Sequence, residues 1–403
     1  MNKLLTIVIP VYKVEEYINK CLDSLILTSE LMEKMDVLII NDGTPDNSAE
    51  MSREYVKKYP NVFRQIDKEN GGHGSVWNLG VKEAYGKYTR FLDSDDWLEN
   101  LDLLLAKLEQ TDADLVITPT LCHCENNELW KLEILDMEFG KVYDANTFDW
   151  LGNRSHGNYI FHHSCTYKTE IFRQYLPLFL EKQPYDDVIL GAASIIGAKS
   201  LVAYDFVLYH YLMDRPGQSI SLDVIRKHTD SRIKTQQHTI KFIEEHPVSA
   251  GTTKYLFITY KHPKRYNYGY RTLLEDLPYA EAKRYAKEWD DWARKQNPTI
   301  TTRWIRAYRK MPFPLYWVGY KTLCLIIKIY KKISCHPFRW VRNIVWDIQF
   351  WIKEFKLQAK EEKELEQVEG FSGHGSMYSF TLYKKFEDER TERKRLHELR
   401  KHN

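Results

Sequence analysis

Three carboxylates stand within four residues in the motif Asp93–Asp96. They follow residues 88–92, which are predicted to form a buried strand. Clustered carboxylates repel one another, and a bound cation relieves that repulsion. A hard divalent ion held by one or two carboxylates and by diphosphate oxygens can neutralise charge on a leaving phosphate. The alternative is structural, because Asp95 or Asp96 could cap the helix predicted from Leu98.

Strands and helices alternate along the first 118 residues. Residue patterns predict strands at 4–12, 36–40, 61–66, 88–92 and 114–118, with helices at 14–25, 49–59, 75–85 and 98–108. Short connections between them indicate a mainly parallel sheet with helices on both faces. Ligands collect beyond the carboxyl ends of such strands. The turns at Tyr12, Asp42, Gly71 and Asp93 all leave strand ends on that side, so we expect them to form one site.

Four segments occur in order with strand–turn–helix spacing: TIVIPVYKVEEYINKCLDSL, VLIINDGTPDNS, ENGGHGSVWNLGVKEAYGKY and TRFLDSDDWLE. Together they resemble the nucleotide-sugar-binding half of the family 2 glycosyltransferases, notably those of bacterial cell-surface polysaccharides. The resemblance covers residues 1–118 closely and continues less sharply to about residue 222. It implies the GT-A fold of that family: an α/β, Rossmann-like, mixed but mainly parallel sheet. A helical C-terminal region would follow.

The resemblance implies roles for residues of a donor site. The base of the nucleotide, usually uracil, would lie against Pro10, Val11 and Tyr12 and would donate a hydrogen bond to Asp42. The alternative for Asp42 is a plain turn residue. Asp93 and Asp95 would correspond to the DxD motif of the family, which contacts ribose and a divalent metal, Mn²⁺ or Mg²⁺. Asp96 could take the role of either of these carboxylates.

The loop that begins at Gly71 and Gly72 departs from the family pattern by carrying His73. Its glycines would let the backbone approach a ligand closely, and Asn78 would face the donor. His73 could contact the diphosphate, but we favour capping of the following helix. Further along, the resemblance implies that Arg215 and Gln218 reach the diphosphate. The alternative for that segment is a simple turn at Pro216-Gly217.

An acidic pair, Asp186-Asp187, stands where the family carries its catalytic Asp. An inverting transfer is a single displacement at the anomeric carbon, so a base must lie opposite the leaving diphosphate. The pair is Asp-Asp instead of the commoner Glu-Asp, which leaves the choice open; we favour Asp187. Both could instead cap the helix predicted near Val188. His162 and His163 are interpreted as core or acceptor-cleft residues and not as metal ligands.

Lys and Arg greatly outnumber Asp and Glu between Thr301 and Leu357, and aromatic residues recur there. This pattern predicts a helix in the interface of an anionic membrane, or else one packed on the catalytic domain. No nucleic-acid-binding motif accompanies the basic residues. The expected organisation is a catalytic domain at 1–222, with donor and acceptor halves at 1–118 and 119–222. A helical extension (223–300), a basic aromatic region (301–358) and a charged tail (359–403) follow.

The composition, with 43% hydrophobic and 28% charged residues among 403, excludes global disorder. No apolar stretch reaches the roughly 20 residues that span a bilayer, and scattered cysteines suit a reducing cytosol. We therefore expect an inverting, metal-dependent glycosyltransferase at the cytoplasmic face of the cell membrane. It would move a sugar, from a UDP-sugar, to a lipid-linked saccharide for a capsule or other surface polysaccharide. The alternatives are an inactive membrane-associated sugar-nucleotide-binding scaffold and a nucleotidyltransferase. The sequence also leaves the oligomeric state open.

Overall fold

The computed structural model of the protein describes residues 3–123, 129–132, 137–150, 162–185, 187–213 and 222–334. The chain divides into two compact units, Met1–Phe313 and Pro314–Asn403. The domain boundaries expected at 222 and 300 fall inside the first unit and stay predictions. Among the described residues, no helix combines the length and the apolar character that crossing a membrane requires.

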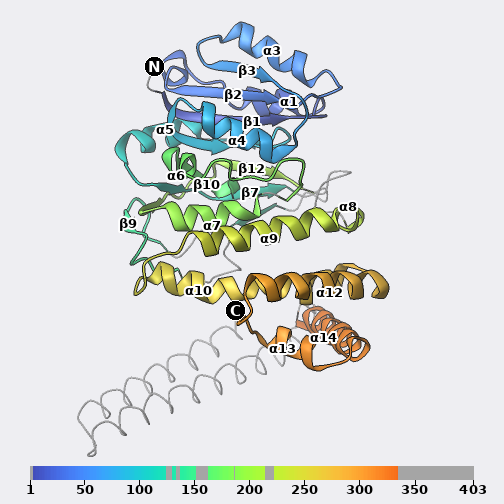
Figure 1. Cartoon of the computed structure of the whole chain (residues 1–403). Helices are drawn as coiled ribbons and strands as arrows, with labels where there is room; N and C mark the ends of the chain where they lie inside the picture. Colours follow the sequence, from blue (N-terminus) through green and yellow to red (C-terminus); the bar gives the residue numbers. More distant parts are fainter. Residues whose placement is uncertain are drawn as a thin grey trace, which may run out of the picture. The chain divides into compact units, whose positions relative to one another are not determined.

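The first unit is built on a sheet of eight strands in the order β3-β2-β1-β4-β10-β6-β11-β9 (Figure 1). Four neighbours run parallel: β1 (Lys3–Val11), β2 (Met35–Asn41), β3 (Phe63–Asp67) and β4 (Gly86–Phe91). β10 (Cys165–Lys168) lies antiparallel between β4 and β6 (Leu115–Ile117). β11 (Ser200–Ala203) runs parallel to β6, and β9 (Tyr143–Asp144) closes the edge. The predicted mixed, mainly parallel sheet is therefore confirmed.

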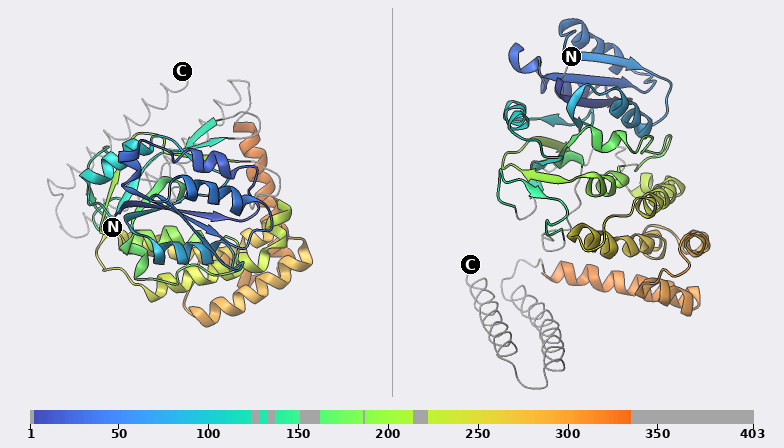
Figure 2. Two further views of the ribbon diagram at one scale, coloured as in Figure 1. Left: turned by 90° about the horizontal axis from the view of Figure 1, so that it is seen from above. Right: turned by 60° about the vertical axis from the view of Figure 1, so that its left-hand side comes forward.

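Helices lie on both faces of this sheet (Figure 2) because successive residues of a strand point to opposite sides. Leu5, Ile7 and Ile9 of β1 belong to one core cluster with residues of α1 (Ile18–Asp23) and α5 (Leu101–Gln110). Val8 belongs to the opposite cluster, with residues of α4 (His73–Glu83), α6 (Glu170–Arg173) and α7 (Val188–Gly197). The remaining early helices are α2 (Ser29–Met32) and α3 (Ser48–Lys58).

A smaller second sheet follows the acidic motif directly. Its strand order is β5-β12-β7-β8, with β5 (Trp97–Leu98), β12 (Tyr209–Leu212), β7 (Thr120–His123) and β8 (Leu129–Leu132). β12 pairs with β5 and with β7, so a strand from the acceptor half is held beside the motif. A short 3-10 helix, η1 (His162–Ser164), comes directly before β10 in the chain.

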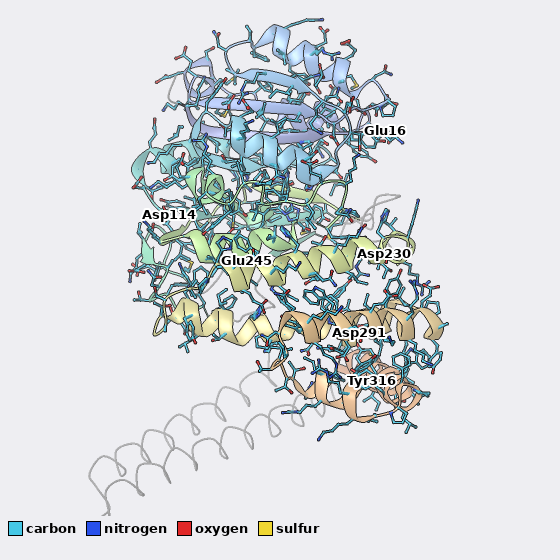
Figure 3. The ribbon with its side chains drawn as sticks, in the orientation of Figure 1. Glu16, Asp114, Asp230, Glu245, Asp291 and Tyr316 are labelled. Atoms are coloured by element: carbon cyan, nitrogen blue, oxygen red, sulfur yellow. The ribbon has the colours of Figure 1, made fainter. Side chains whose placement is uncertain are left out.

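The helical region predicted after residue 222 is observed. It comprises α8 (Leu222–Lys227), α9 (Thr229–Glu245), α10 (Thr253–Tyr266), η2 (Asn267–Tyr270), α11 (Thr272–Asp276), α12 (Tyr279–Gln296) and α13 (Arg303–Lys310). Side chains occupy the space between α9, α10 and α12 (Figure 3). Glu244 of α9 accepts hydrogen bonds from Tyr266 at 2.8 Å and Gln296 at 2.6 Å, which joins the three helices. The second unit contributes the described part of α14 (Phe313–Ser334).

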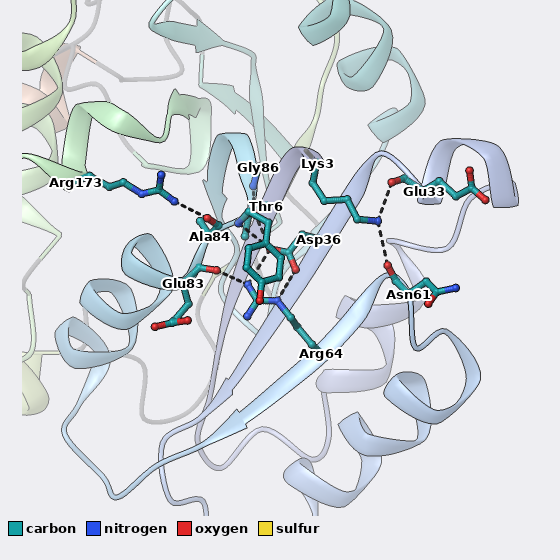
Figure 4. A network of polar contacts seen from close by, with 11 residues as sticks. Lys3, Thr6, Glu33, Asp36, Asn61, Arg64, Glu83, Ala84, Gly86 and Arg173 are labelled. Atoms are coloured by element: carbon teal, nitrogen blue, oxygen red, sulfur yellow. Dashed lines mark hydrogen bonds and ion pairs between the residues drawn. The ribbon is translucent and has the colours of Figure 1, made fainter. Parts of the chain in front are cut away.

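A buried polar network closes the amino-terminal edge of the sheet (Figure 4). Asp36, at the start of β2, accepts hydrogen bonds from Thr6 Oγ1 at 2.8 Å and Arg64 Nε at 2.6 Å. Arg64 also donates to the Glu83 carbonyl at 2.6 Å, and the Gly86 N–H donates to Thr6 Oγ1 at 2.8 Å. These groups satisfy one another, so this edge is structural. The chemistry-bearing turns lie at the opposite edge.

Gly86 starts β4 in this network, and Gly86→Ala is expected to destabilise the fold strongly. A Cβ there would lie 2.3 Å from Thr6 N and 2.6 Å from the Tyr88 carbonyl oxygen, and these backbone atoms cannot move aside cheaply. Overpacking of this kind is expected to lower the free energy of unfolding by about 1–3 kcal/mol or more, measured by chemical denaturation. Gly319→Ala is the matched control, because its Cβ would meet no atom within 4 Å. Equal stability of the two variants would contradict the packing argument.

Candidate active site

The carboxyl ends of three strands meet at one edge of the main sheet. β1 pairs with β2 through Val11 opposite Asn41, and with β4 through Val8 opposite Phe91. The turns that follow these strands are therefore neighbours. The sequence-based expectation that these turns lie together is met by the strand pairing.

The three residues predicted to line a base pocket differ in exposure. Val11 is fully buried and Pro10 is partly buried, whereas the Tyr12 ring is 43% exposed. The N–H of Lys13 donates to Thr44 Oγ1 at 2.8 Å, which ties the turn after β1 to the turn after β2. Tyr12 is thus the member of the set whose side chain is most open to a ligand.

Asp42, which follows β2, holds the loop that follows β3. Its carboxylate accepts hydrogen bonds from the N–H groups of Gly71 and Gly72, each at 2.8 Å, and from Lys68 Nζ at 2.6 Å. Asp42 is therefore more than a plain turn residue. A carboxylate offers about four lone pairs, so these three bonds leave capacity for one further donor. Its predicted contact with a nucleotide base stays a prediction.

The same loop is joined to the segment that leads to the acidic pair. The N–H of Lys182 donates to the Gly71 carbonyl at 2.6 Å, and a Cβ on Gly72 would lie 3.1 Å from the Lys182 backbone. Asn78 holds the segment as well, because its amide donates to the Phe179 carbonyl at 2.8 Å and accepts from the Phe179 N–H at 3.0 Å. The resemblance implied that Asn78 faces a donor. In the structure, both ends of this amide are instead hydrogen-bonded to the backbone of Phe179.

Asp187 occupies the N-cap position of α7 and is partly buried, but its side chain makes no capping hydrogen bond to that helix. The capping of α7 that the sequence offered as the alternative for Asp187 is therefore not observed. Tyr185, two residues earlier, has φ of 67°, a backbone conformation that costs about 1 kcal/mol or more in a non-glycine residue and is often found at functional sites. Asp186, Arg215 and Gln218 lie outside the described residues.

Asp93 is surrounded by three imidazoles. Its Oδ2 lies 3.2 Å from His162 Nε2 and 3.7 Å from His163 Nε2, and its Oδ1 lies 3.4 Å from His73 Nε2. Burial alone would raise the pKa of Asp93, but the facing imidazoles, His162 foremost, hold that pKa well below its usual range. Burial lowers the pKa of His163 to about 4, with the neighbouring His162 adding to the effect.

The histidine arrangement corrects the capping role expected for His73 and places His162 and His163 beside Asp93. His73 begins α4, yet the helix has no side-chain cap and the imidazole is directed at Asp93 instead. The rings of His162 and His163 lie 3.7 Å apart between centroids, tilted by 38°, and both face that carboxylate. The only sequence signal was the His-His doublet itself. Nothing in its local pattern could show that 69 residues of intervening chain fold back to Asp93.

Asp96 has a different environment from Asp93, although the two are three residues apart. It is buried, and it accepts hydrogen bonds from Tyr209 Oη at 2.7 Å and from the Leu212 N–H at 2.8 Å, both on β12. Burial, followed by the charges of Asp95 and Asp93, raises the pKa of Asp96 well above its usual range. Asp96 therefore anchors β12 to the motif, whereas Asp93 and Asp95 are both partly exposed.

The buried guanidinium of Arg90 holds the backbone of the histidine pair in place. Arg90 of β4 is fully buried, donates to Thr166 Oγ1 at 2.9 Å and also donates to the His163 carbonyl. Burial lowers the pKa of Arg90 to about 10, which still leaves it charged near neutral pH. This side chain fixes η1 to β4, which ends two residues before Asp93. It is a positioning residue for the imidazoles.

The residues around Asp93 fit a divalent metal ion. Among the described residues, Asp93, His162 and His163 form a group of three whose potential ligand atoms all lie within 4.8 Å of one another. Carboxylate oxygens and imidazole nitrogens are the usual protein ligands of first-row divalent metals. The metal contact predicted for Asp93 stays a prediction. The histidines beside it were not expected.

Comparison with known proteins places the N-terminal part of the chain among glycosyltransferases. Residues 6–176 match the profile of the family described as "Glycosyl transferase family 2". An uncharacterised glycosyltransferase of Mycoplasma pneumoniae is 32% identical over 227 residues, which cover 54% of this chain and 71% of that protein. The minor teichoic acid biosynthesis protein GgaB of Bacillus subtilis is 33% identical over 145 residues, covering 33% of this chain and 16% of GgaB.

The similarities to other relatives and to solved structures are partial. The chain spans only 20% and 33% of the length of other curated relatives that it matches. Residues 1–349 of S. aureus TarS, solved in complex with UDP, superpose with a TM-score of 0.47 at 15% identity, covering 76% of this chain and 91% of that one.

Proposed function

Because the chain belongs to glycosyl transferase family 2, we propose that it moves a sugar from a nucleotide-sugar donor to a saccharide acceptor, with inversion at the anomeric carbon. The donor is a UDP-sugar, and the acceptor is a lipid-linked saccharide of a surface polymer. Support for the polymer comes from the similarity to GgaB, a protein of teichoic acid biosynthesis.

One observation carries this proposal: direct contacts join four separate loops into one site. The loop after β3 meets the turn after β2 through Asp42 and the motif after β4 through His73. It also meets the segment leading to Asp187 through the bond between Gly71 and Lys182. A purely structural arrangement would not require acidic side chains at each of these turns. A donor that binds across these four loops would have a base, Asp187, within the same site.

The chemistry assigned to the side chains follows from their environments. Asp187 accepts the proton of the acceptor hydroxyl as that oxygen bonds to the anomeric carbon, while the bond from this carbon to the diphosphate oxygen breaks. Asp93 and Asp95, both partly exposed, hold a divalent ion. When bound, this ion supplies positive charge to the leaving diphosphate. Asp42 and Tyr12 bind the nucleotide base at the β1–β2 end of the site.

A membrane surface is the proposed location of the acceptor. α13 carries four basic residues in eight, and Ile305 alone among its residues is buried. On the described part of α14 several large apolar side chains are more than half exposed: Leu315 (60%), Val318 (56%), Leu325 (57%) and Ile326 (56%). Basic and apolar surfaces of this kind suit an anionic membrane interface. The rest of the expected membrane region, 335–358, lies outside the described residues.

Calorimetric titration of the full chain with UDP, GDP and their sugar conjugates tests the donor site. We expect metal-dependent, micromolar binding of one nucleotide, weakened about tenfold or more by Asp95→Asn because a metal-facing charge is lost. Asp102→Asn, an exposed change in α5, is the matched control. Slow hydrolysis of one conjugate would then identify the sugar.

Two results would count against the proposal. If no nucleotide binds, or if Asp95→Asn binds as tightly as the control, the donor site is wrong. Tight binding without hydrolysis or transfer to any lipid-linked acceptor would favour the inactive scaffold.

A further inference from the structure

We propose that a row of arginine and aromatic side chains, which leads from the candidate base to α13, binds phosphate groups of the acceptor. The row, which we call the arginine ladder, consists of Tyr185, Arg232, Tyr268, Arg271, Trp304 and Arg303. The inference rests on the proposed function, because it assigns a chemical class, a phosphate-bearing saccharide, to the acceptor of that transfer.

The ladder begins two residues before the candidate base. The guanidinium carbon of Arg232, on α9, lies 5.8 Å from the centroid of the Tyr185 ring and 5.6 Å from that of the Tyr268 ring. α9 also contacts the same segment through Thr235 Oγ1, which lies 3.4 Å from the Pro184 carbonyl oxygen. Arg232 therefore links the segment that carries the base to η2.

The ladder continues from η2 to α13. The N–H of Arg271 donates to the Tyr268 carbonyl at 3.4 Å. The guanidinium carbons of Arg271 and Arg303 lie 5.1 Å and 4.9 Å from the centroid of the Trp304 ring. Each guanidinium of the ladder is thus within cation–π distance of an aromatic ring.

Hydrogen bonds and packing hold the elements that carry the ladder. Thr302 Oγ1, at the N-cap of α13, donates to Asn267 Oδ1 of η2 at 2.5 Å. The buried indole of Trp289, on α12, donates to the Tyr266 carbonyl at 2.9 Å, and it leaves no space for a side chain at Gly269. A binding surface on a fixed backbone loses less conformational freedom when its ligand binds.

The chemistry of the ladder favours phosphate over a neutral sugar. Stacking uses the planar face of a guanidinium, whereas its N–H donors point outward in the plane and match two oxygens of a phosphate. Arg271 and Arg303 are exposed, and neither forms an ion pair within the part of the chain that the structure describes. Two cations beside one indole repel each other, and a shared anion relieves that repulsion.

The place of the ladder suits the acceptor and not the donor. The proposed donor site lies at the turns that follow β1, β2 and β4, and the acceptor hydroxyl must reach the base opposite the leaving diphosphate. A molecule that follows the ladder would end beside Tyr185 and therefore beside that base. The other end of the ladder lies on α13, which the proposed membrane surface includes.

Binding of soluble probes tests the inference without any transfer reaction. The full chain is titrated calorimetrically with an oligo(glycerol phosphate), with farnesyl diphosphate and with an uncharged maltooligosaccharide. We expect a phosphate probe to bind, more weakly as salt is added. Arg232→Gln and Arg271→Gln should each lower its affinity about tenfold, the loss expected for one charge-assisted contact. Lys57→Gln, which removes the same charge on an exposed face of α3, should leave that affinity unchanged.

The two phosphate probes distinguish the sources of the phosphate. Preference for oligo(glycerol phosphate) would place it in the saccharide chain, and preference for farnesyl diphosphate would place it in the lipid carrier; either supports the ladder. Photo-crosslinking of a benzophenone-labelled probe to the unaltered protein covers the case in which a variant fails to fold. The crosslinked peptides should contain residues of the ladder, and attachment elsewhere alone would overturn the proposal.

Three other results would overturn it: no binding of either phosphate probe, equal binding of the uncharged saccharide, or unchanged affinity in folded arginine variants. If the variants lose binding only to phosphatidylglycerol vesicles, these arginines belong to the membrane surface and the ladder is wrong. UDP affinity, measured on the same samples, reports the donor site separately. If a phosphate probe binds through the arginines but no nucleotide binds, the ladder stands and the donor function fails.

Discussion

Replacing Asp187 by Asn is expected to lower the turnover of sugar transfer by about 10²- to 10⁴-fold, while nucleotide binding stays unchanged. The amide cannot take the proton of the acceptor hydroxyl, so the displacement loses its base. Asp187 stands at the start of α7 and makes no capping hydrogen bond to that helix. Initial rates with saturating donor, together with UDP affinity by calorimetry, give the two quantities.

Asp186→Asn is the matched comparison, since it removes one carboxylate at the neighbouring position. If Asp187 is the base, the Asp186 variant keeps most of its turnover. A larger loss in Asp186→Asn would transfer the role of base to that residue. Equal and small losses in both would show that neither carboxylate accepts the proton.

The second large effect is expected at Asp93. Asp93→Asn should abolish metal-supported nucleotide binding and lower kcat/KM about 10³-fold, because a metal ligand and its charge are both lost. That fall corresponds to about 4 kcal/mol of transition-state stabilisation. The three imidazoles would then face a neutral amide. Thermal unfolding should be measured beside the kinetics, to separate loss of the ion from loss of the fold.

Asp291→Asn is the control for this change, because the residue is exposed on α12 (Figure 3) and remote in sequence from the site. It should retain kcat/KM within about twofold, as expected for a surface substitution. If Asp93→Asn were as active as this control, Asp95 alone would have to hold the metal, and the cluster around Asp93 would be structural.

The strand-and-turn order of the first 118 residues was predictable, because each signal is local. β1 alternates its apolar residues between two faces, and the turns at Asp42 and Asp93 follow strands that pair in parallel. Strand ends in such a sheet must meet at one edge. The acidic motif could therefore be placed in the site before any contact was known.

The contacts within the site were not predictable, because they depend on packing between distant segments. Asn78 was expected to face a donor, but its amide is taken by the Phe179 backbone, 101 residues away. The histidines of η1 reach Asp93 only because β10 inserts between β4 and β6. A one-dimensional pattern carries no signal for such an insertion. The pKa of Asp93 is held low by imidazoles, whereas burial and the neighbouring carboxylates raise the pKa of Asp96, so the opposite directions also depend on packing.

The backbone hydrogen bond between Lys182 and Gly71 limits how this chain can be recombined with its relatives. An exchange of the acceptor half between relatives, at a crossover anywhere from 73 to 181, would take Lys182 from one parent and Gly71 from the other. The incoming residue at 182 must tolerate the left-handed backbone found there, with φ of 54°, and must leave room for Gly72. Chimaeras that take these positions from one parent should therefore fold more often than chimaeras with random crossovers.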